Sequence, residues 1–151
     1  MKNIIVFVGL LSFSLSSLAG SKLHGVGAML GEPTGITYRY QFKDNVFLDG
    51  GLDYRLGDRA HIYGSYLMIA PQSLLIFGQV TKWFYGGGFR SKTKEHDDKD
   101  KTFFGARGAT GLLYTPKSEP FELFIQLAPT LNIIPETSVD FDFNIGARFV
   151  F

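Results

Sequence analysis

The sequence predicts an all-β fold, an eight-stranded antiparallel up-and-down barrel, from three observations. First, the last eleven residues, 141–151, alternate large apolar side chains with polar or small ones, as a strand does between two environments. Second, turn residues divide the chain from residue 22 onward into eight segments of strand length. Third, this part of the chain has no long period-3.6 pattern and no run of eighteen apolar residues, so we expect no long helix.

Turn chemistry separates the first three expected strands. Gly31, Pro33 and Gly35 favour a tight turn after the first strand, and Asp44-Asn45 has the two-residue length of a hairpin connection. A further turn is expected at 56–59. Between these turns the second segment alternates without exception, with apolar residues on one face and polar residues on the other. We expect strands at about 22–30, 36–43 and 46–55.

The remaining five strands are less evenly spaced. Pro71 interrupts the sequence before the apolar run 74–77, which leaves the boundary between the fourth and fifth strands open. The hydrophilic segment 91–102 is expected to form a loop, and the segments 115–120 and 129–138 to connect the last strands. The strands themselves are expected at about 60–68, 80–89, 103–114, 121–128 and 141–151.

An export signal is expected before the barrel. A single early lysine is followed by the apolar stretch 4–18, and the small residues Ser17 and Ala19 suit a signal peptidase, so residues 1–19 are predicted to be a signal peptide. Residues 20–151 would then form one domain, with a length that suits eight strands of about ten residues. Because the chain has no cysteine, a lipid anchor, disulfides and zinc–thiolate sites are excluded.

The charge balance argues against one class of partner. Without residues 1–19 the chain carries 14 Lys and Arg residues against 14 Asp and Glu residues, so no net field attracts nucleic acid. Aromatic residues make up 15% of the sequence, which also contains 18 glycines. This composition suits a barrel with bands of aromatic side chains and closely packed strands.

Alternation alone does not say which face of the barrel is inside. In a soluble lipocalin-like barrel the apolar face would surround a ligand, whereas in a membrane barrel it would meet lipid. The crowding of aromatic residues on the apolar face, the export signal and the terminal phenylalanine together favour the membrane barrel. We therefore predict a transmembrane barrel in the bacterial outer membrane, with its charged side chains inside.

The inward charges are expected to pair with one another. An eight-stranded barrel is just wide enough for side chains to fill its interior. An unpaired charge there would cost several kcal/mol, and the mixed signs of these residues permit pairing. The predicted interior polar network consists of Arg39, Asp49, Asp53, Arg55, Arg90, Arg107, Glu122, Asp142 and Arg148, with Lys43 on the same face.

The end of the chain resembles the assembly signal on the final strand of outer-membrane barrels. Its polar, glycine and aromatic positions are Asn144, Gly146, Phe149 and Phe151. More widely, most of residues 25–151 resembles small eight-stranded outer-membrane barrels of the OmpX and OmpA membrane-domain type, including an uncharacterised family of such barrels. The segments that carry this resemblance are 27–36, 122–129 and 140–148.

The resemblance implies contact with outer-membrane lipid and insertion by the barrel assembly machinery, and it is nearly silent on activity. Some members of the uncharacterised family have been linked to the binding of host factors. Such a function would reside in loops, which this sequence does not visibly share with them.

No catalytic or cofactor site is predicted. His61 and Ser65 share a strand face, but four residues separate them by about 13 Å, too far for a nucleophile–base hydrogen bond. Gly86-Gly87-Gly88 lies inside an expected strand, which indicates close strand packing or a bend rather than a phosphate cradle. The acidic residues of 91–102 alternate with lysines, which favours a solvated loop over a calcium site. We expect no enzyme, no cofactor and no metal.

For function, the leading hypothesis is a structural or surface-interaction protein, adhesin-like or host- or ligand-binding, that acts through its outer loops. With both chain ends in the periplasm, segment 91–102 is the most polar outer loop and the expected contact for a surface protein or ligand. A small transporter or pore is the alternative. A soluble lipocalin-like binder is the third possibility. The predicted outer loops are 31–35, 56–59, 91–102 and 129–138.

Overall fold

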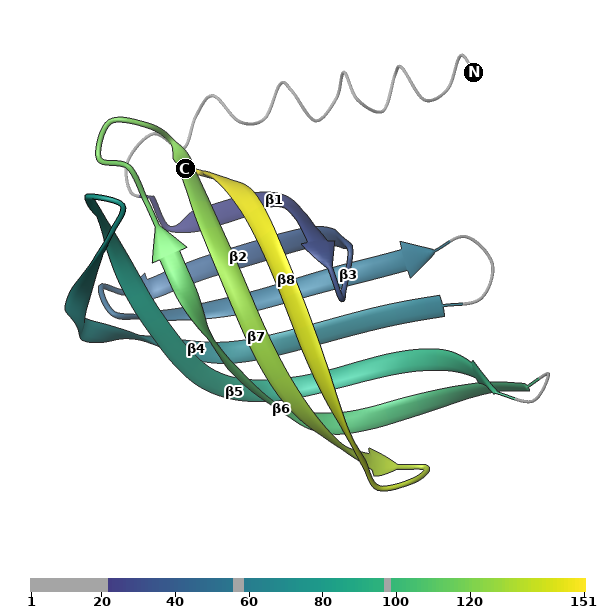
Figure 1. Ribbon diagram of the computed structural model, residues 1–151. Coiled ribbons are helices and arrows are strands. Elements are labelled where there is room, and N and C mark those ends of the chain that lie inside the picture. The colour runs from purple at the N-terminus through teal and green to yellow at the C-terminus, as the bar shows by residue number, and fades with distance from the viewer. Residues whose placement is uncertain (1–21, 56–58, 97–98) are drawn as a thin grey trace, which may run out of the picture.

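The computed structural model describes residues 22–55, 59–96 and 99–151, which form a closed antiparallel barrel of eight strands (Figure 1). Each strand pairs with its neighbours in sequence, and β8 pairs with β1. The predicted fold class is confirmed. The strands are β1 (His24–Gly31), β2 (Gly35–Lys43), β3 (Val46–Arg55), β4 (Arg59–Ile76), β5 (Gln79–His96), β6 (Lys99–Tyr114), β7 (Phe121–Ile134) and β8 (Ser138–Val150).

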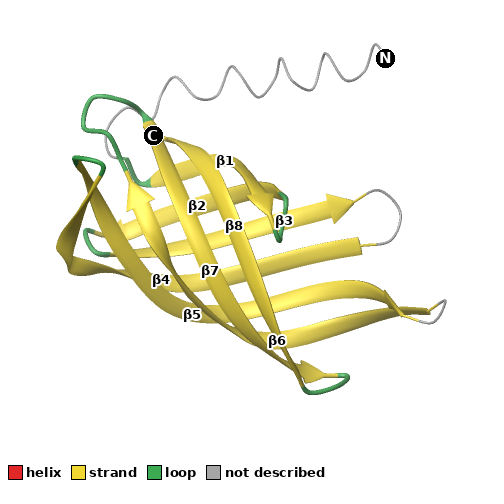
Figure 2. Ribbon diagram, viewed as in Figure 1, coloured by secondary structure: helices red, strands yellow, loops and turns green. Residues whose placement is uncertain are grey.

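Closure of the barrel brings its first and last strands together. The N–H of His24 donates to the carbonyl oxygen of Phe151 at 3.0 Å, and the N–H of Phe151 donates to the carbonyl of His24 at 2.9 Å. The connections after β2, β4 and β6 lie at this same end, which we call the terminal end, and the other connections lie at the distal end (Figure 1). Strands make up most of the described chain, with short loops between them (Figure 2).

The expected loop at 91–102 is wrong, because most of this segment continues the barrel strands. β5 runs to His96 and β6 begins at Lys99, and the Thr93 and Thr102 hydroxyls lie 3.2 Å apart across the pair. The extension stands beyond the neighbouring strands at the distal end, so it has no apolar face to bury. A ribbon whose two faces are both polar lacks the hydrophobic alternation from which strands were predicted.

Two strands continue past a proline residue near which each was expected to end. β7 continues through Pro129 to Ile134, although 129–138 was expected to be a loop, and the β6–β7 pairing is interrupted near Pro129. β4 continues through Pro71 to Ile76, with a register shift against β5 between Ile69 and Ser73. Because proline donates no backbone hydrogen bond, a strand is expected to end near it. Here the barrel accommodates each proline as a local irregularity in strand pairing.

The side chains are arranged with polar groups inside and apolar groups outside. Arginine, aspartate, glutamate and asparagine side chains are buried in the interior, for example Arg90 and Glu122. Large apolar residues, among them Ile36, Phe89 and Phe141, are exposed on the outer face. The strand alternation therefore separates two environments opposite to those of a water-soluble barrel.

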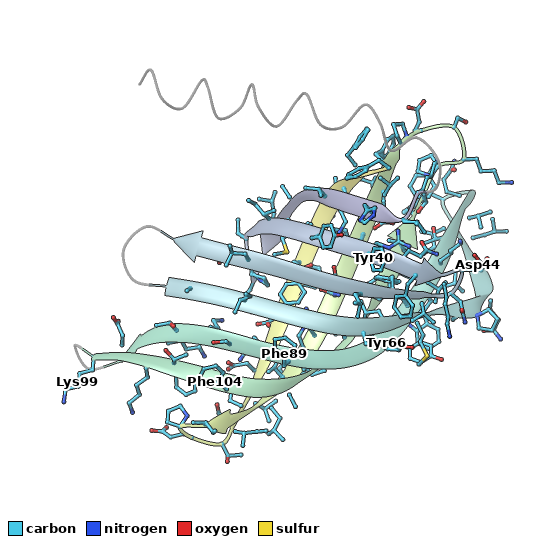
Figure 3. All side chains as sticks on the ribbon, turned by 180° about the vertical axis from the view of Figure 1, so that it is seen from behind. Tyr40, Asp44, Tyr66, Phe89, Lys99 and Phe104 are labelled. Atoms are coloured by element: carbon cyan, nitrogen blue, oxygen red, sulfur yellow. The ribbon has the colours of Figure 1, made fainter. Side chains whose placement is uncertain are left out.

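Tyrosine and tryptophan side chains gather on the outer face toward the terminal end. In Figure 3, Tyr40 and Tyr66 lie in the half of the barrel near the turn residue Asp44, whereas Phe89 and Phe104 lie in the half toward Lys99. The rings of Trp83 and Tyr85 on β5 lie near one another, with centroids 5.4 Å apart and planes tilted by 42°. We call this band the tyrosine girdle; it consists of Tyr38, Tyr40, Tyr66, Trp83, Tyr85 and Tyr114.

The interior near the terminal end is apolar, which the sequence reasoning did not anticipate. Phe47 and Phe84 meet edge to face, with ring centroids 5.7 Å apart, and Leu67 and Leu113 are buried with them. These residues occupy inward positions of β3 to β6, beside the polar residues of the same strands. The barrel therefore has an apolar plug at its terminal end, and its interior is polar from there toward the distal end. No helix in the described ranges is long and apolar enough to cross a membrane.

Candidate functional site

The polar interior brings together most of the residues predicted for it. Four arginines and four carboxylates of the predicted network are buried, so their formal charges balance. Arg55 belongs to β3, but its side chain lies outside the described part of the structure. Lys43 is exposed at the end of β2, so its expected interior position is wrong. The eight buried members are Arg39, Arg90, Arg107, Arg148, Asp49, Asp53, Glu122 and Asp142.

The first cluster of the interior, which we call the lower cluster, is built around Glu122 on β7. One oxygen of Glu122 pairs with Arg39 from β2, and the other accepts a hydrogen bond from Arg148 Nη1 at 2.8 Å. Arg148 also pairs with Asp49 and donates from Nε to the Thr37 hydroxyl at 3.1 Å. Two arginines thus share two carboxylates, and the contacts join strands that are far apart in the sequence.

Gln126 connects the lower cluster to Arg107. Its Nε2 donates to Asp49 at 3.1 Å, and its Oε1 accepts from Arg107 Nη2 at 2.8 Å. The guanidinium carbon of Arg107 lies 3.8 Å from the centre of the Tyr63 ring. Because a guanidinium is weakly hydrated and flat, stacking on a ring lowers the cost of burying its charge.

The second cluster, the upper cluster, lies nearer the distal end around Arg90 on β5. Arg90 Nη1 donates to Asp142 at 2.8 Å, while Nη2 donates to Asn132 at 2.8 Å and to Asp140 at 2.6 Å. Asp140 also receives a hydrogen bond from Lys94 at 3.0 Å. This cluster therefore ties β5 to β7 and β8 at the level where the barrel opens toward its distal connections.

Sequence reasoning missed several members of these clusters. Asn132 lies inside the segment 129–138 that was expected to be a loop, and Asp140 lies just after it. Thr37 and Gln126 were not singled out because they carry no charge. One signal could have found Asn132: the inward alternation of β7 from Glu122 continues through Gln126 and Thr130 to Asn132. His61, with Nε2 3.6 Å from Asp142 Oδ2, was considered only as a catalytic candidate.

Ion pairs also fasten the distal end of the barrel. The β5–β6 extension reaches its neighbours through three lysines, each paired with a carboxylate. Lys101 Nζ lies 3.1 Å from Glu136 Oε1 beyond β7, and Lys92 pairs with Glu32 beyond β1. These exposed contacts position the hairpin without burying it. Within the described ranges, no three histidine or acidic side chains are grouped so that they could hold a metal ion.

The predicted terminal signature occupies both faces of β8. Asn144 is buried in the interior, whereas Phe149 is exposed on the outer face and stacks on Phe151 with ring centroids 6.1 Å apart. Gly146 lies where a Cβ atom would be 2.4 Å from the Phe124 ring and 2.7 Å from the Ala28 carbonyl oxygen. The glycine therefore gives Phe124 the space to stack on Arg148 at 3.9 Å.

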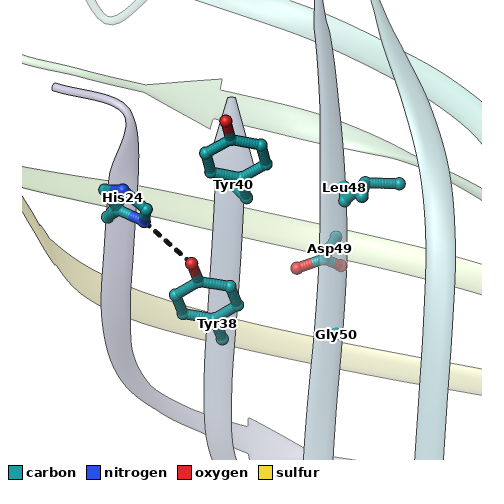
Figure 4. A pocket seen from close by; sticks show the side chains of 6 residues that line it. All are labelled: His24, Tyr38, Tyr40, Leu48, Asp49 and Gly50. Atoms are coloured by element: carbon teal, nitrogen blue, oxygen red, sulfur yellow. Dashed lines mark hydrogen bonds between the residues drawn. The ribbon is translucent and has the colours of Figure 1, made fainter. Parts of the chain in front are cut away.

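A groove of about 570 Å³ lies on the barrel wall at the start of β1, beside the middle of β2 and the first half of β3 (Figure 4). His24 Nδ1 and the Tyr38 hydroxyl are hydrogen-bonded at 2.8 Å along one side, and Tyr40 stands beside them. Leu48 and Gly50 contribute the opposite side. Its lining is mostly apolar and aromatic, and it also includes Asp49, which pairs with Arg148 in the lower cluster.

The fold and the interior together define a class: a closed eight-stranded antiparallel barrel with a polar, charge-paired interior and an apolar exterior. No protein-family model matches the sequence, and no curated protein matches it. Among solved structures, the N-terminal β-barrel domain of Pseudomonas aeruginosa OprF is similar, with a TM-score of 0.57 and 14% identity over 85% of this chain and 95% of that domain. The likeness in fold to eight-stranded outer-membrane barrels, expected from the sequence, is confirmed.

Proposed function

We propose that this protein is a small outer-membrane β-barrel whose strands span the bilayer around a side-chain-filled interior, and that it acts as a structural or surface-interaction protein. One observation carries the proposal: charged residues are buried and large apolar residues are exposed. In water this arrangement would leave many apolar side chains hydrated, whereas in a bilayer they meet lipid. Closed hydrogen bonding of all eight strands satisfies the backbone inside hydrocarbon.

The tyrosine girdle supports an orientation for the barrel. Tyrosine and tryptophan concentrate where the bilayer meets water, so the girdle marks the interface at the terminal end. Both chain ends of the barrel lie there, which makes it the periplasmic end for an exported protein of this class. The distal end, with the β5–β6 extension, then faces outward from the cell.

A soluble ligand-binding barrel is a weaker account of the same fold. Such a barrel would need an apolar interior with space for a ligand and a polar outer face. Here the interior positions hold ion pairs such as Arg39 with Glu122, and the outer face carries Phe89 and Phe141. The filled interior likewise favours a structural role over a steady pore. We propose no catalytic, cofactor or metal role.

Export and insertion complete the proposal. Residues 1–19 lie outside the described residues, and we propose that they are a cleaved signal peptide on the strength of their composition. Asn144, Gly146, Phe149 and Phe151 are proposed as the signal read by the barrel assembly machinery. The stacked aromatic pair Phe149 and Phe151, of which Phe149 is exposed and Phe151 half-buried, supports this role, since a partner can contact it before the barrel closes.

The β5–β6 extension is the proposed contact for a surface protein or ligand. It carries lysine and acidic side chains on a hydrogen-bonded pair of strands, and ion pairs through Lys92 and Lys101 hold it to neighbouring segments. Exposed polar segments on a stable scaffold are common recognition sites. A contact of this kind would be polar and would weaken as salt rises.

The proposal is tested by membrane fractionation of cells that express the full chain. We expect the protein to sediment with outer membrane, to resist carbonate extraction, and to change its gel mobility on heating, because a closed barrel has no free edge from which to unfold. Recovery in the soluble periplasmic fraction would contradict the proposal.

A further inference from the structure

The β4–β5 hairpin at the terminal end carries the least covered apolar side chains of the described chain. Phe77 at its tip is fully exposed, and Leu75 is 77% exposed. In the same hairpin Val80 is 55% exposed and Leu74 is 43% exposed. The whole segment 60–81 contains no Asp, Glu, Lys or Arg residue. The hairpin therefore differs in chemistry from the charged β5–β6 extension at the distal end, and an apolar surface of this kind indicates a contact outside the chain.

The turn of this hairpin is unusual for its residue type. Phe77 and Gly78 connect the strands with φ angles of 51° and 75°, so both central residues are left-handed, as in a type I′ turn. Asparagine or glycine suits such a position, whereas a bulky residue there is conformationally strained. Because the Phe77 side chain is fully exposed, packing within the chain does not offset this strain.

The hairpin begins at the level of the tyrosine girdle. Tyr66 on β4 and Trp83 on β5 belong to the girdle, and the register shift between Ile69 and Ser73 lies beside Trp83. Bulges of this kind bend a strand pair, and Figure 1 shows β4 turning sharply at the base of the hairpin. Six residues from Trp83 to Phe77 span about 20 Å, more than a headgroup layer of about 5–7 Å. A straight hairpin would leave the membrane surface.

The hairpin exposes apolar side chains on both of its faces. Leu74 and Leu75 are consecutive in a strand, so they point to opposite faces, and Leu75 pairs with Val80 across the hairpin. A protein partner docked on one face would leave the other in water. Lipid can surround both faces and the tip together.

We propose that the hairpin, residues 73–80, lies along the periplasmic surface of the outer membrane, with Leu74, Leu75, Phe77 and Val80 inserted at the boundary between headgroups and acyl chains. This inference rests on the proposed function, because it requires the barrel to span the membrane with its terminal end in the periplasm. The hairpin acts as a lateral anchor that fixes the depth and tilt of the barrel.

Backbone hydrogen bonding limits the depth of insertion. The pairing of β4 with β3 ends at Met68, and the Ile69 N–H still donates to the Asn45 carbonyl oxygen at 2.7 Å. From residue 70 onward, β4 has no strand neighbour on that side, so its outer edge there has free backbone groups. Unpaired backbone groups are strongly disfavoured in hydrocarbon, which confines this edge to the polar interface. The Tyr114 hydroxyl donates to Gln79 Oε1 at 3.0 Å, which ties the hairpin to a girdle residue.

The absence of cysteine permits a direct test with single labels. Leu74→Cys, Leu75→Cys, Asn45→Cys and Ile145→Cys variants of the full-length mature chain would each carry an environment-sensitive fluorophore. The proteins are reconstituted in phosphatidylethanolamine–phosphatidylglycerol vesicles, and quenching is measured with nitroxide-labelled lipid and with aqueous iodide. Position 145 on the outer face reports the spanning barrel, and position 45 in the β2–β3 turn is the aqueous control at the same end.

We expect both hairpin labels to be quenched by shallow lipid nitroxide severalfold more strongly than the label at 45, together with strong quenching at 145. Iodide quenching of both hairpin labels equal to that at 45, with 145 still in lipid, would overturn the anchor alone. Protection from iodide of only one hairpin label, or protection that is lost at one barrel per vesicle, would indicate a contact with a second copy of the chain and would also overturn the anchor. Absence of lipid quenching at 145 would instead overturn the proposed function.

A turn variant separates insertion from folding of the hairpin. In Phe77→Asn the left-handed turn is kept by a residue that favours it, while the apolar tip is lost. We expect lipid quenching at 74 and 75 to fall with quenching at 145 unchanged. Unchanged quenching at all three positions would overturn the assigned role of Phe77.

Discussion

At the scale of single residues, the interior arginines combine two kinds of contact. Their N–H groups donate to carboxylate or amide oxygens, and three of them also lie over an aromatic ring: Arg39 over Phe47, Arg107 over Tyr63 and Arg148 over Phe124. The carboxylates neutralise the charge, and the rings cover the flat faces of the guanidinium. Arg39, Arg90 and Arg148 thereby avoid the larger penalty of an unpaired ion, and Arg107 is held by Gln126 and by the Tyr63 ring.

The first prediction concerns Glu122, which accepts from both Arg39 and Arg148. Glu122→Gln removes the charge that two buried arginines share, so we expect a loss of about 3–5 kcal/mol in the free energy of unfolding, measured with urea in lipid vesicles. Lys101→Gln is the matched control, because its pair with Glu136 is exposed, and it should cost less than about 1 kcal/mol. Equal losses in the two variants would contradict the interior network.

The second prediction concerns Gly146. A Cβ atom there would meet the Phe124 ring and the Ala28 carbonyl, so Gly146→Ala should cost about 1–3 kcal/mol through overpacking. At Gly108 the nearest atom to an added Cβ lies 3.7 Å away, so Gly108→Ala should change the stability by less than about 0.5 kcal/mol. Urea titration of both variants in vesicles measures the difference, and a neutral Gly146→Ala would show that Phe124 can move freely.

At the scale of elements, the strands divide into a common barrel wall and two extensions of opposite character. The β5–β6 extension at the distal end is polar and held by ion pairs, whereas the β4–β5 hairpin at the terminal end is uncharged and apolar. Between them, the alternation of the wall strands keeps charges inside and apolar residues outside. Each extension suits the surroundings that its end of the barrel would have in an outer membrane.

The third prediction concerns the closing strand. Replacing Phe149 and Phe151 with serine should remove the stacked aromatic pair at the end of the closing strand and leave the chain unassembled and degraded, measured as its level in outer-membrane fractions. Val150→Thr, on the buried inward face of the same strand, should be mild. The same membrane level for both variants would show that the terminal aromatic residues carry no assembly signal.

The fourth prediction concerns the β5–β6 extension. A Gly/Ser linker in place of 92–101 removes the exposed charges but leaves the interior clusters, except for the Lys94 contact to Asp140. We expect a heat-modifiable barrel at normal membrane level that no longer crosslinks to surface partners on intact cells. If every partner of the parent protein still crosslinks, recognition must lie elsewhere on the distal end.

At the scale of the whole molecule, the sequence was sufficient for the eight-stranded barrel and for most of its interior. Period-two alternation predicts inward positions for residues such as Arg39, Asp49 and Arg148, because every second side chain of a strand points to the same face. The alternation does not identify a strand, or its inner face, where the two faces do not differ in polarity as expected. The extension at 91–102 is polar on both faces, and the apolar plug of Phe47 and Phe84 lies on the face that was expected to be polar.

The arrangement of partners could not be read from the sequence at all. Which carboxylate pairs with Arg90 depends on the stagger of strands around the barrel, and that stagger is a property of the closed sheet. Asp140 and Asn132 reach Arg90 only because β7 and β8 continue beyond their predicted ends. The chemistry of the interior was therefore predictable by residue type and not by pair.

The central claim is that the exposed apolar face of the barrel contacts lipid, and a single charge on that face tests it most directly. Ile145 lies in the middle of β8 and is 54% exposed. In lipid vesicles we expect Ile145→Lys to lower the free energy of unfolding by about 2–4 kcal/mol, as lysine does near the middle of a bilayer. A change within about 0.5 kcal/mol, the usual effect of a substitution on a water-exposed surface, would contradict the claim.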